Sequence, residues 1–192
     1  EKQKDVILMS AGEHNLSVIW TSPSDHSVYL HKFKMKKCPY SQFGWEEKGD
    51  VLGQTAANMT YNVTFYDLTP YTDYCFQMVL LYDSKGYYVW TGGERFIFRT
   101  LSSIPETPEP PKVEPLSIQS GYEVKWIEPE DNGAVIFSYI LQYWDVQHQS
   151  WYEVFNGSET HWVVDDIIVP RGSEYVFRVA AENSNGIGPF SY

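Results

Sequence analysis

Residues 68–78 have the sequence Leu68-Thr69-Pro70-Tyr71-Thr72-Asp73-Tyr74-Cys75-Phe76-Gln77-Met78, a proline turn followed by large apolar residues at every second position. A period of two predicts a half-buried β-strand, because successive side chains point to opposite faces of a sheet. Tyr74 opens this strand, and its ring is predicted to pack inward. A buried phenol needs a partner for its hydroxyl group, and the turn just upstream offers backbone groups.

Segments of the same kind recur on both sides of this stretch, while helical periodicity is nearly absent. Residues 16–20, 33–36 and 95–99 each predict a short strand. Aromatic residues make up 17% of the chain, and large rings suit the pleated, half-buried surface of a small sandwich. Short strands separated by turn residues at regular intervals predict an all-β, antiparallel sandwich.

The same order of strands then repeats. The corresponding tryptophans and tyrosines are each a little over 100 residues apart, which is the size of one sandwich domain. The matched segments are residues 122–126 with the Trp20 strand, 139–143 with the Phe33 strand, 151–154 with 45–47, and 175–179 with the Tyr74 strand. The chain is therefore predicted to contain two similar domains.

A proline-rich segment, residues 101–111, separates the two copies. Its four prolines fix φ and remove backbone donors, so the segment cannot join a central strand. We expect a short, stiff connector and a boundary near residue 104, which gives domains at residues 1–103 and 104–192. The second copy stops at Tyr192, before a seventh strand could finish, and is expected to be truncated at its C-terminal end.

Each half resembles a fibronectin type III domain, an immunoglobulin-like β-sandwich. The resemblance depends on a tryptophan in the second strand and a tyrosine at the start of the sixth. It implies a structural core that includes Trp20, Tyr74, Trp126 and Tyr175. Residues 68–74 fit the Leu-x-Pro-x-Thr-x-Tyr corner of the family, and residues 174–183 with 186–191 are close to its consensus. The second copy departs from the corner, because Pro170 comes one place early.

Residues 129–133, 155–158 and 177–183 are similar to segments of the membrane-proximal domains in Sevenless/Ros receptor tyrosine kinases. This resemblance implies an ectodomain of a single-pass membrane protein with a cytoplasmic kinase. Similar strings occur in cell-adhesion and axon-guidance receptors. A cytokine-receptor pair is a weaker alternative, since residues 188–191 are Gly-Pro-Phe-Ser where that family has Trp-Ser-x-Trp-Ser.

Charge and glycosylation signals bear on the partner and the compartment. The net charge of −11 disfavours nucleic acid and anionic membrane surfaces, because like charges repel. Acceptor sequences of the form Asn-x-Ser/Thr predict an extracellular glycoprotein at the plasma membrane. An intracellular muscle-type array is the other option, and free thiols would favour it. The acceptor asparagines are Asn15, Asn58, Asn62 and Asn156.

Cys38 and Cys75 are the only cysteines. If Tyr74 and Phe76 face the core, Cys75 faces outward, and Cys38 on the neighbouring third strand does the same. A disulfide between the two strands is geometrically reasonable, and the glycosylation signals favour it over two free thiols.

Aromatic residues after the sixth strand form the predicted protein contact, which consists of Tyr87, Tyr88 and Trp90. Exposed Tyr and Trp residues are common interface anchors. The alternatives are that they belong to the last strand or pack at the joint between domains. The acidic segment 128–133 lacks the spaced ligands of a calcium loop and favours a turn.

Catalytic patterns are missing from the sequence. The five histidines are scattered, without metal-ligand spacing, and we find no catalytic triad or glycine-rich phosphate loop. We therefore expect no enzyme activity in these domains, no cofactor and no small-molecule substrate. The expected function is that of a spacer and interaction surface for a protein ligand or co-receptor.

Overall fold

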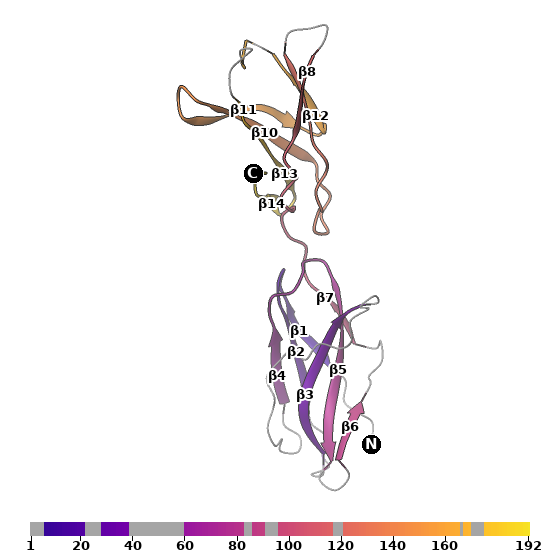
Figure 1. Ribbon diagram of the computed structural model, residues 1–192. Helices are drawn as coiled ribbons and strands as arrows, with labels where there is room; N and C mark the ends of the chain where they lie inside the picture. Colours follow the sequence, from indigo (N-terminus) through magenta and orange to yellow (C-terminus); the bar gives the residue numbers. More distant parts are fainter. Residues whose placement is uncertain are drawn as a thin grey trace. The chain divides into compact units, whose positions relative to one another are not determined.

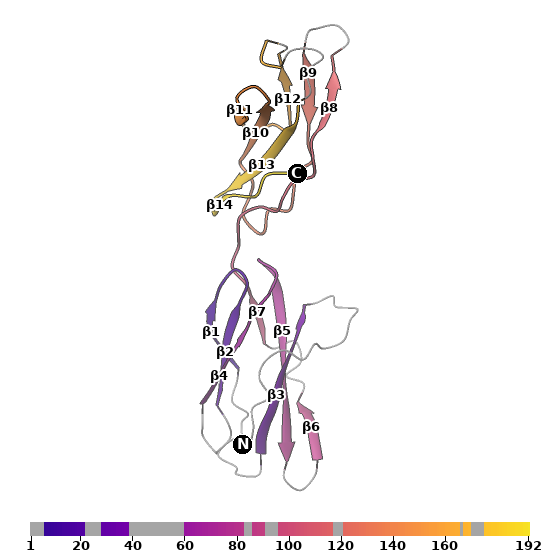
Figure 2. The same ribbon diagram turned by 60° about the vertical axis from the view of Figure 1, so that its left-hand side comes forward.

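The computed structural model has β-strands as its regular elements in the residues that it describes (Figures 1 and 2). It divides into two compact units, Glu1–Leu101 and Ser102–Tyr192. The predicted all-β, antiparallel architecture is confirmed. The described residues are 6–21, 28–38, 60–82, 86–90, 96–116, 121–165, 167–169 and 175–192, with the backbone alone in 28–34, 77–82 and 86–90.

The first unit is a sandwich of two antiparallel sheets. One sheet has the order β1-β2-β4, and in the other β5 pairs with β3, β6 and β7. Each sheet sends every second side chain into the space between the layers. The strands are β1 (Ile7–Ala11), β2 (Leu16–Thr21), β3 (Val28–Lys37), β4 (Thr60–Phe65), β5 (Asp73–Tyr82), β6 (Gly86–Trp90) and β7 (Ile97–Arg99).

The core of the first unit lies between these sheets. The rings of Phe65 on β4 and Phe76 on β5 have centroids 5.2 Å apart and join the two layers. Trp20 is 1% exposed and packs near Tyr61. Tyr74 is also buried, and its hydroxyl oxygen accepts a 2.8 Å hydrogen bond from the backbone N–H of Thr69. This bond ties the start of β5 to the turn before it.

The second unit repeats the arrangement. One sheet has the order β12-β9-β8 and the other β11-β10-β13-β14, and all pairs are antiparallel. Its buried core includes Trp126, Tyr139 and Leu141. The strands are β8 (Lys112–Pro115), β9 (Tyr122–Lys125), β10 (Ser138–Asp145), β11 (Ser150–Gly157), β12 (His161–Val164), β13 (Phe177–Asn183) and β14 (Gly186–Ile187).

Tyr175 differs from Tyr74, its counterpart in the first unit. Its ring packs against Tyr122 with centroids 4.6 Å apart. Burial, and to a smaller extent a hydrogen bond with Tyr122, raises the pKa of Tyr175 to about 12. The turn at residues 170–174, including the early Pro170, lies outside the described residues. The phenol of Tyr175 thus finds a partner in β9.

The end of the chain follows β13. After β14, the N–H of Gly188 donates to the carbonyl of Ala181 and the N–H of Ser191 to that of Val179. Beyond β14, residues 188–191 therefore stay hydrogen-bonded alongside β13.

Two residues separated only by Ser102 are hydrogen-bonded to different units near the boundary. The N–H of Leu101 donates to the carbonyl of Gly12 at 2.9 Å, within the first unit. The N–H of Ser103 donates to the carbonyl of Asn132 at 3.2 Å, within the second. The predicted boundary at residue 104 therefore falls inside a segment that is bonded to the second unit.

Candidate interaction surfaces

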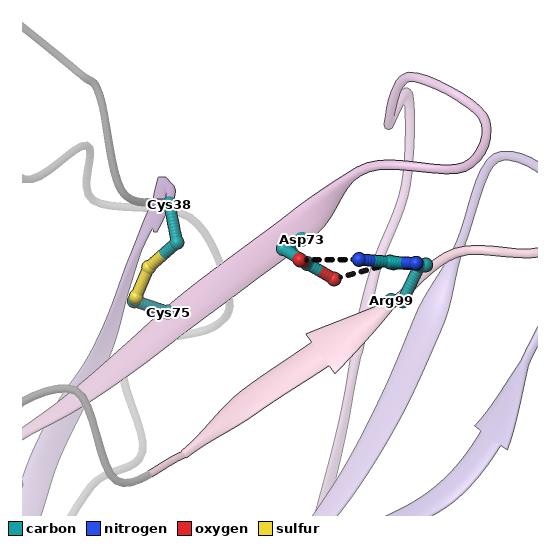
Figure 3. Close-up of a disulfide and its surroundings, with 4 residues drawn as sticks. All are labelled: Cys38, Asp73, Cys75 and Arg99. Carbon is teal, nitrogen blue, oxygen red and sulfur yellow. Dashed lines mark hydrogen bonds and ion pairs between the residues drawn. A yellow bond between two sulfur atoms is a disulfide. The ribbon is translucent and has the colours of Figure 1, made fainter.

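A disulfide joins Cys38, just after β3, to Cys75 on β5 (Figure 3). Their Cα atoms are 5.6 Å apart, and the N–H of Cys38 donates to the carbonyl of Asp73 at 2.8 Å. Tyr74 and Phe76 belong to the core cluster, whereas Cys75 between them does not. The strand alternation therefore places Cys75 on the outer face of the sheet, where it is nevertheless 1% exposed. The bond joins two neighbouring strands, with Cys75 buried and Cys38 half-buried.

Asp73 and Arg99 form a two-pronged ion pair close to the disulfide (Figure 3). Nε and Nη2 of Arg99 each donate to one carboxylate oxygen at 2.7 Å. Hydrogen bonding from Arg99 lowers the pKa of Asp73, and burial opposes this only partly. The guanidinium carbon also lies 4.7 Å from the centroid of the Tyr71 ring. The cluster links β5 to β7 at the surface, where an ion pair contributes little to stability.

The predicted aromatic contact is part of a strand rather than a loop. Tyr87 pairs with Leu81 and Tyr88 with Leu80 in the β5–β6 ladder, so the backbone of both tyrosines belongs to a strand. The segment forms a strand because its backbone groups find partners along β5. The side chains of Tyr87, Tyr88 and Trp90 lie outside the described residues, and their contact with a partner stays a prediction.

A stack of aromatic rings and an arginine lies on the outer face of the β11-β10-β13-β14 sheet. The guanidinium carbon of Arg178 is 4.0 Å from the ring centroid of Trp151 and 4.3 Å from that of Phe190. Its Nε and Nη2 both donate to Oε1 of Gln142. Burial lowers the pKa of Arg178, which still leaves it charged at neutral pH. We call Gln142, Trp144, Trp151, Arg178 and Phe190 the arginine stack.

The arginine stack is not apparent from the sequence alone. Trp144 and Trp151 are opposite each other across β10 and β11 and meet edge to face at 5.3 Å. In the sequence, Arg178 belongs to the segment 174–183 that is close to the family consensus. Its alternation with the buried Phe177 and Val179 was the available signal that it faces outward, but the stacking partners come from other strands.

The acidic segment at residues 128–133 is a turn that holds the chain entering the second unit. Asn132 and Gly133 have φ values of 52° and 86°, as expected for an Asn-Gly turn. Nδ2 of Asn132 donates to the carbonyl of Ile104 at 2.9 Å. The N–H of Glu106 donates to the carbonyl of Glu130.

Clusters suited to metal binding do not occur among the described residues, where no group of three or more His, Cys, Asp or Glu side chains converges. The contact between His148 and Asp145 is local. Nδ1 of His148 lies 2.7 Å from Oδ2 of Asp145 in the same hairpin. No helix in the described part of the chain is long and apolar enough to cross a membrane.

The acceptor asparagines differ in their surroundings. Asn62 lies on β4 and Asn156 on β11, and both are exposed. Oδ1 of Asn156 accepts a hydrogen bond from Ser138. Asn15 is half-buried in a turn in which the N–H of Gly12 donates to its carbonyl. Asn58 lies outside the described residues.

Charge is divided unevenly between the two units. Residues 1–101 contain 10 Lys and Arg and 11 Asp and Glu, whereas residues 102–192 contain 4 and 14. The formal net charge is therefore −1 for the first unit and −10 for the second. Most of the net negative charge of the chain therefore lies in the second unit, where Arg178 is one of four basic residues.

Comparison with known proteins identifies the fold and the relatives. Fibronectin type III domain is the family whose model matches residues 106–192. The crystal structure of chicken CNTN1 FN1-FN3 domains has a TM-score of 0.61, covering 97% of this chain and 62% of that chain at 18% identity. This likeness extends the shared fold over both units.

Two curated relatives show similarity at the sequence level. Fibronectin type-III domain-containing protein 3A of Pongo abelii is 32% identical over 133 residues, which cover 68% of this chain and 11% of the relative. Proto-oncogene tyrosine-protein kinase ROS of Mus musculus is 28% identical over 192 residues, which cover 92% of this chain and 7% of the relative. The chain thus spans about a tenth or less of either relative. Its sequence, sheet order and structural match together show that it belongs to the fibronectin type III family, as two such domains in tandem.

Proposed function

We propose that this chain is an extracellular module of a cell-surface receptor, where it acts as a spacer and as a surface for a protein ligand or co-receptor. Fibronectin type III domains are non-catalytic modules. The parent that we infer is a single-pass membrane protein similar to the Sevenless/Ros receptor tyrosine kinases. The similarity to ROS, which covers 92% of this chain, supports such a parent.

The disulfide between Cys38 and Cys75 is the observation that carries the extracellular assignment. Disulfides persist in oxidising compartments and are rare where thiols are kept reduced. Cys38 and Cys75 are joined between neighbouring strands, so oxidation requires no rearrangement of this sheet. Exposed acceptor asparagines, Asn62 and Asn156, support the same compartment because glycans need room at the surface.

The spacer function is supported by how the connecting chain is bonded. Leu101 bonds to the first unit and Ser103 to the second, and Ser102 alone separates them. Ser102 also accepts a hydrogen bond from Nδ2 of Asn185 through its hydroxyl oxygen. A connector this short leaves little chain to extend between the domains.

The experiment that tests the compartment is secretion of the chain from eukaryotic cells behind a signal peptide. Thiols are then titrated under denaturing, non-reducing conditions. We expect none to react without reductant and two per chain after reduction. Two reactive thiols without reductant would contradict an extracellular function and favour the intracellular array.

The binding surface of the first domain is tested with a Tyr87→Ser, Tyr88→Ser double variant of the parent protein. Aromatic anchors bury large areas at small entropic cost, so we expect weaker ligand binding at the cell surface. Arg178→Met, which alters the arginine stack of the second domain, is compared with the double variant in the same binding assay. Unchanged binding in a folded double variant would make the two tyrosines structural residues of β6.

The membrane position is tested by the residues that follow Tyr192 in the parent. We expect completion of the last strand and then an apolar span of about 20 residues. A further series of folded domains at that position would exclude a membrane-proximal site.

A further inference from the structure

The outer face of the β1-β2-β4 sheet is apolar along one row. Ile7, Ile19 and Asn62 are directly opposite one another in the two strand ladders. Ile7 is 62% exposed and Met9 57% exposed. The irregularity in the β1–β2 register between Leu8 and Ser10 gives Met9 no partner in the ladder. The face therefore presents large apolar side chains to solvent, with one asparagine among them.

Met9 reaches the amide group of that asparagine. Its sulfur lies 3.3 Å from Nδ2 of Asn62, although β2 runs between their strands. The side chain of Met9 must therefore cross the outer face of β2. Nδ2 is the atom to which an N-linked sugar is attached, so a sugar at Asn62 would begin in contact with Met9.

The acceptor sequence is oriented for such a sugar. Asn62 is exposed, whereas Val63, the next residue, is 5% exposed and belongs to the core. Thr64 returns to the outer face, where its hydroxyl lies 2.8 Å from that of Ser17. The strand thus holds the modified atom outward while the middle residue of the acceptor sequence anchors it.

We infer that an N-linked glycan on Asn62 covers the apolar row formed by Ile7, Met9 and Ile19. The inference rests on the proposed extracellular function, because the modification occurs in the secretory pathway. Transfer from a lipid-pyrophosphate-linked oligosaccharide breaks the bond between sugar C1 and phosphate oxygen and forms the C1–Nδ2 bond. The amide nitrogen loses one proton, and the lipid pyrophosphate leaves.

The glycan rather than a protein partner is the occupant that fits this face. A sugar attached at the β4 end of the apolar row and in contact with Met9 blocks the close approach of another protein. It also stands on β4, at the end of the described sheet order, where unpaired backbone groups invite pairing with another chain. The C–H groups and acetyl methyl of the first sugar can pack on the apolar side chains. Without this cover, the row would be a site of association.

Occupancy is tested on the chain secreted from eukaryotic cells, by peptide mass spectrometry after enzymatic deglycosylation in heavy-oxygen water. We expect Asn62 to be converted to labelled aspartate. Thr64→Ser, which keeps the acceptor sequence, should retain the glycan, and Thr64→Ala should lose it.

The covering function is tested by removing the glycan from the folded protein under native conditions. We expect increased fluorescence of a dye that binds apolar surfaces, and increased self-association in light scattering. Asn62→Gln should reproduce both changes, and adding Ile7→Thr and Met9→Thr should reverse them. Asn156→Gln, which removes an acceptor site in the other unit, is the matched control and should leave both signals unchanged.

The possible outcomes separate this inference from the proposed function. Modification of Asn156 with an unmodified Asn62 would overturn the inference and leave the extracellular function standing. An occupied Asn62 whose removal changes neither dye binding nor association would overturn the covering function. Absence of glycan from every acceptor asparagine would overturn the inference and contradict the extracellular function as well.

Discussion

The side-chain amide of Asn183 donates a 2.8 Å hydrogen bond to the backbone carbonyl of Ser103, 80 residues earlier in the chain. The same nitrogen lies 3.0 Å from the carbonyl oxygen of Asp131 and 3.2 Å from that of Ala134. Its Oδ1 accepts from the N–H of Asn185. One buried side chain therefore connects the entering chain, the acidic turn and the end of β13.

Asn183→Ala should lower the free energy of unfolding of the second domain by about 2–3 kcal/mol, because the carbonyl groups of Ser103, Asp131 and Ala134 lose the hydrogen bonds of this buried amide. Asn183→Asp should cost at least as much, since a carboxylate would face carbonyl oxygens. Urea unfolding measures both. Asn185→Ala, at an exposed residue, is the control and should have the smaller effect. Equal losses in the free energy of unfolding for Asn183→Ala and Asn185→Ala would show that the buried hydrogen bonds of Asn183 contribute no more than those of an exposed residue.

Tyr74→Phe should destabilise the first domain by about 1–3 kcal/mol, because the N–H of Thr69 loses its acceptor. Tyr66→Phe is the matched control, since Tyr66 is 65% exposed and its hydroxyl can remain in water. Thermal unfolding followed by circular dichroism compares the two variants. The same loss of stability in both variants would argue that the hydrogen bond between Tyr74 and Thr69 does not stabilise the turn.

Trp20→Ala and Trp126→Ala should each destabilise their own domain by about 3–5 kcal/mol, the usual cost of emptying a core aromatic position. Hydrogen-exchange mass spectrometry follows each domain separately. The indole N–H of both residues is buried with no partner among the described atoms, so Trp→Phe should cost less than Trp→Ala. A loss below about 1 kcal/mol would place the residue outside the core.

Arg99→Gln should destabilise the first domain at neutral pH and have less effect in acid. The pKa of Asp73 is lowered in the folded state, so its contribution is present above the unfolded value of about 4. That contribution is lost as the pH falls through the folded pKa. Urea unfolding of Arg99→Gln, Asp73→Asn and the double variant at neutral and acid pH isolates the pair. A coupling energy that does not fall in acid would contradict the assignment.

Arg178→Lys should destabilise the second domain by about 1 kcal/mol, because a lysine cannot stack its charge flat between Trp151 and Phe190. Arg178→Met removes the charge but keeps an unbranched stem, and it should have a similar effect. Chemical unfolding measures the loss. Full stability of the lysine variant would mean that charge alone, rather than the planar stack, matters at this position.

Local sequence patterns were enough to predict the architecture. The period-two pattern at residues 16–20 and 74–78 predicts strands, because alternation follows from the geometry of a single strand. The repetition of Trp20 as Trp126 predicts two domains of the same kind. The Asn132-Gly133 pair predicts a turn, because these residue types tolerate positive φ. Each inference depends on neighbours in the chain, and the structure has strands and a turn at those places.

The candidate surfaces depend on strand register and on long-range contacts, which local patterns do not contain. Arg178 meets Trp151 and Phe190 because β13 is placed beside β10 and the end of the chain. Tyr87 and Tyr88 belong to a strand because β5 supplies partners for their backbone groups. Met9 reaches Asn62 because the β1–β2 ladder is irregular at Met9 and because β2 pairs with β4, the strand of Asn62. A one-residue shift in either register would move each side chain to the opposite face, so these meetings follow from the tertiary structure.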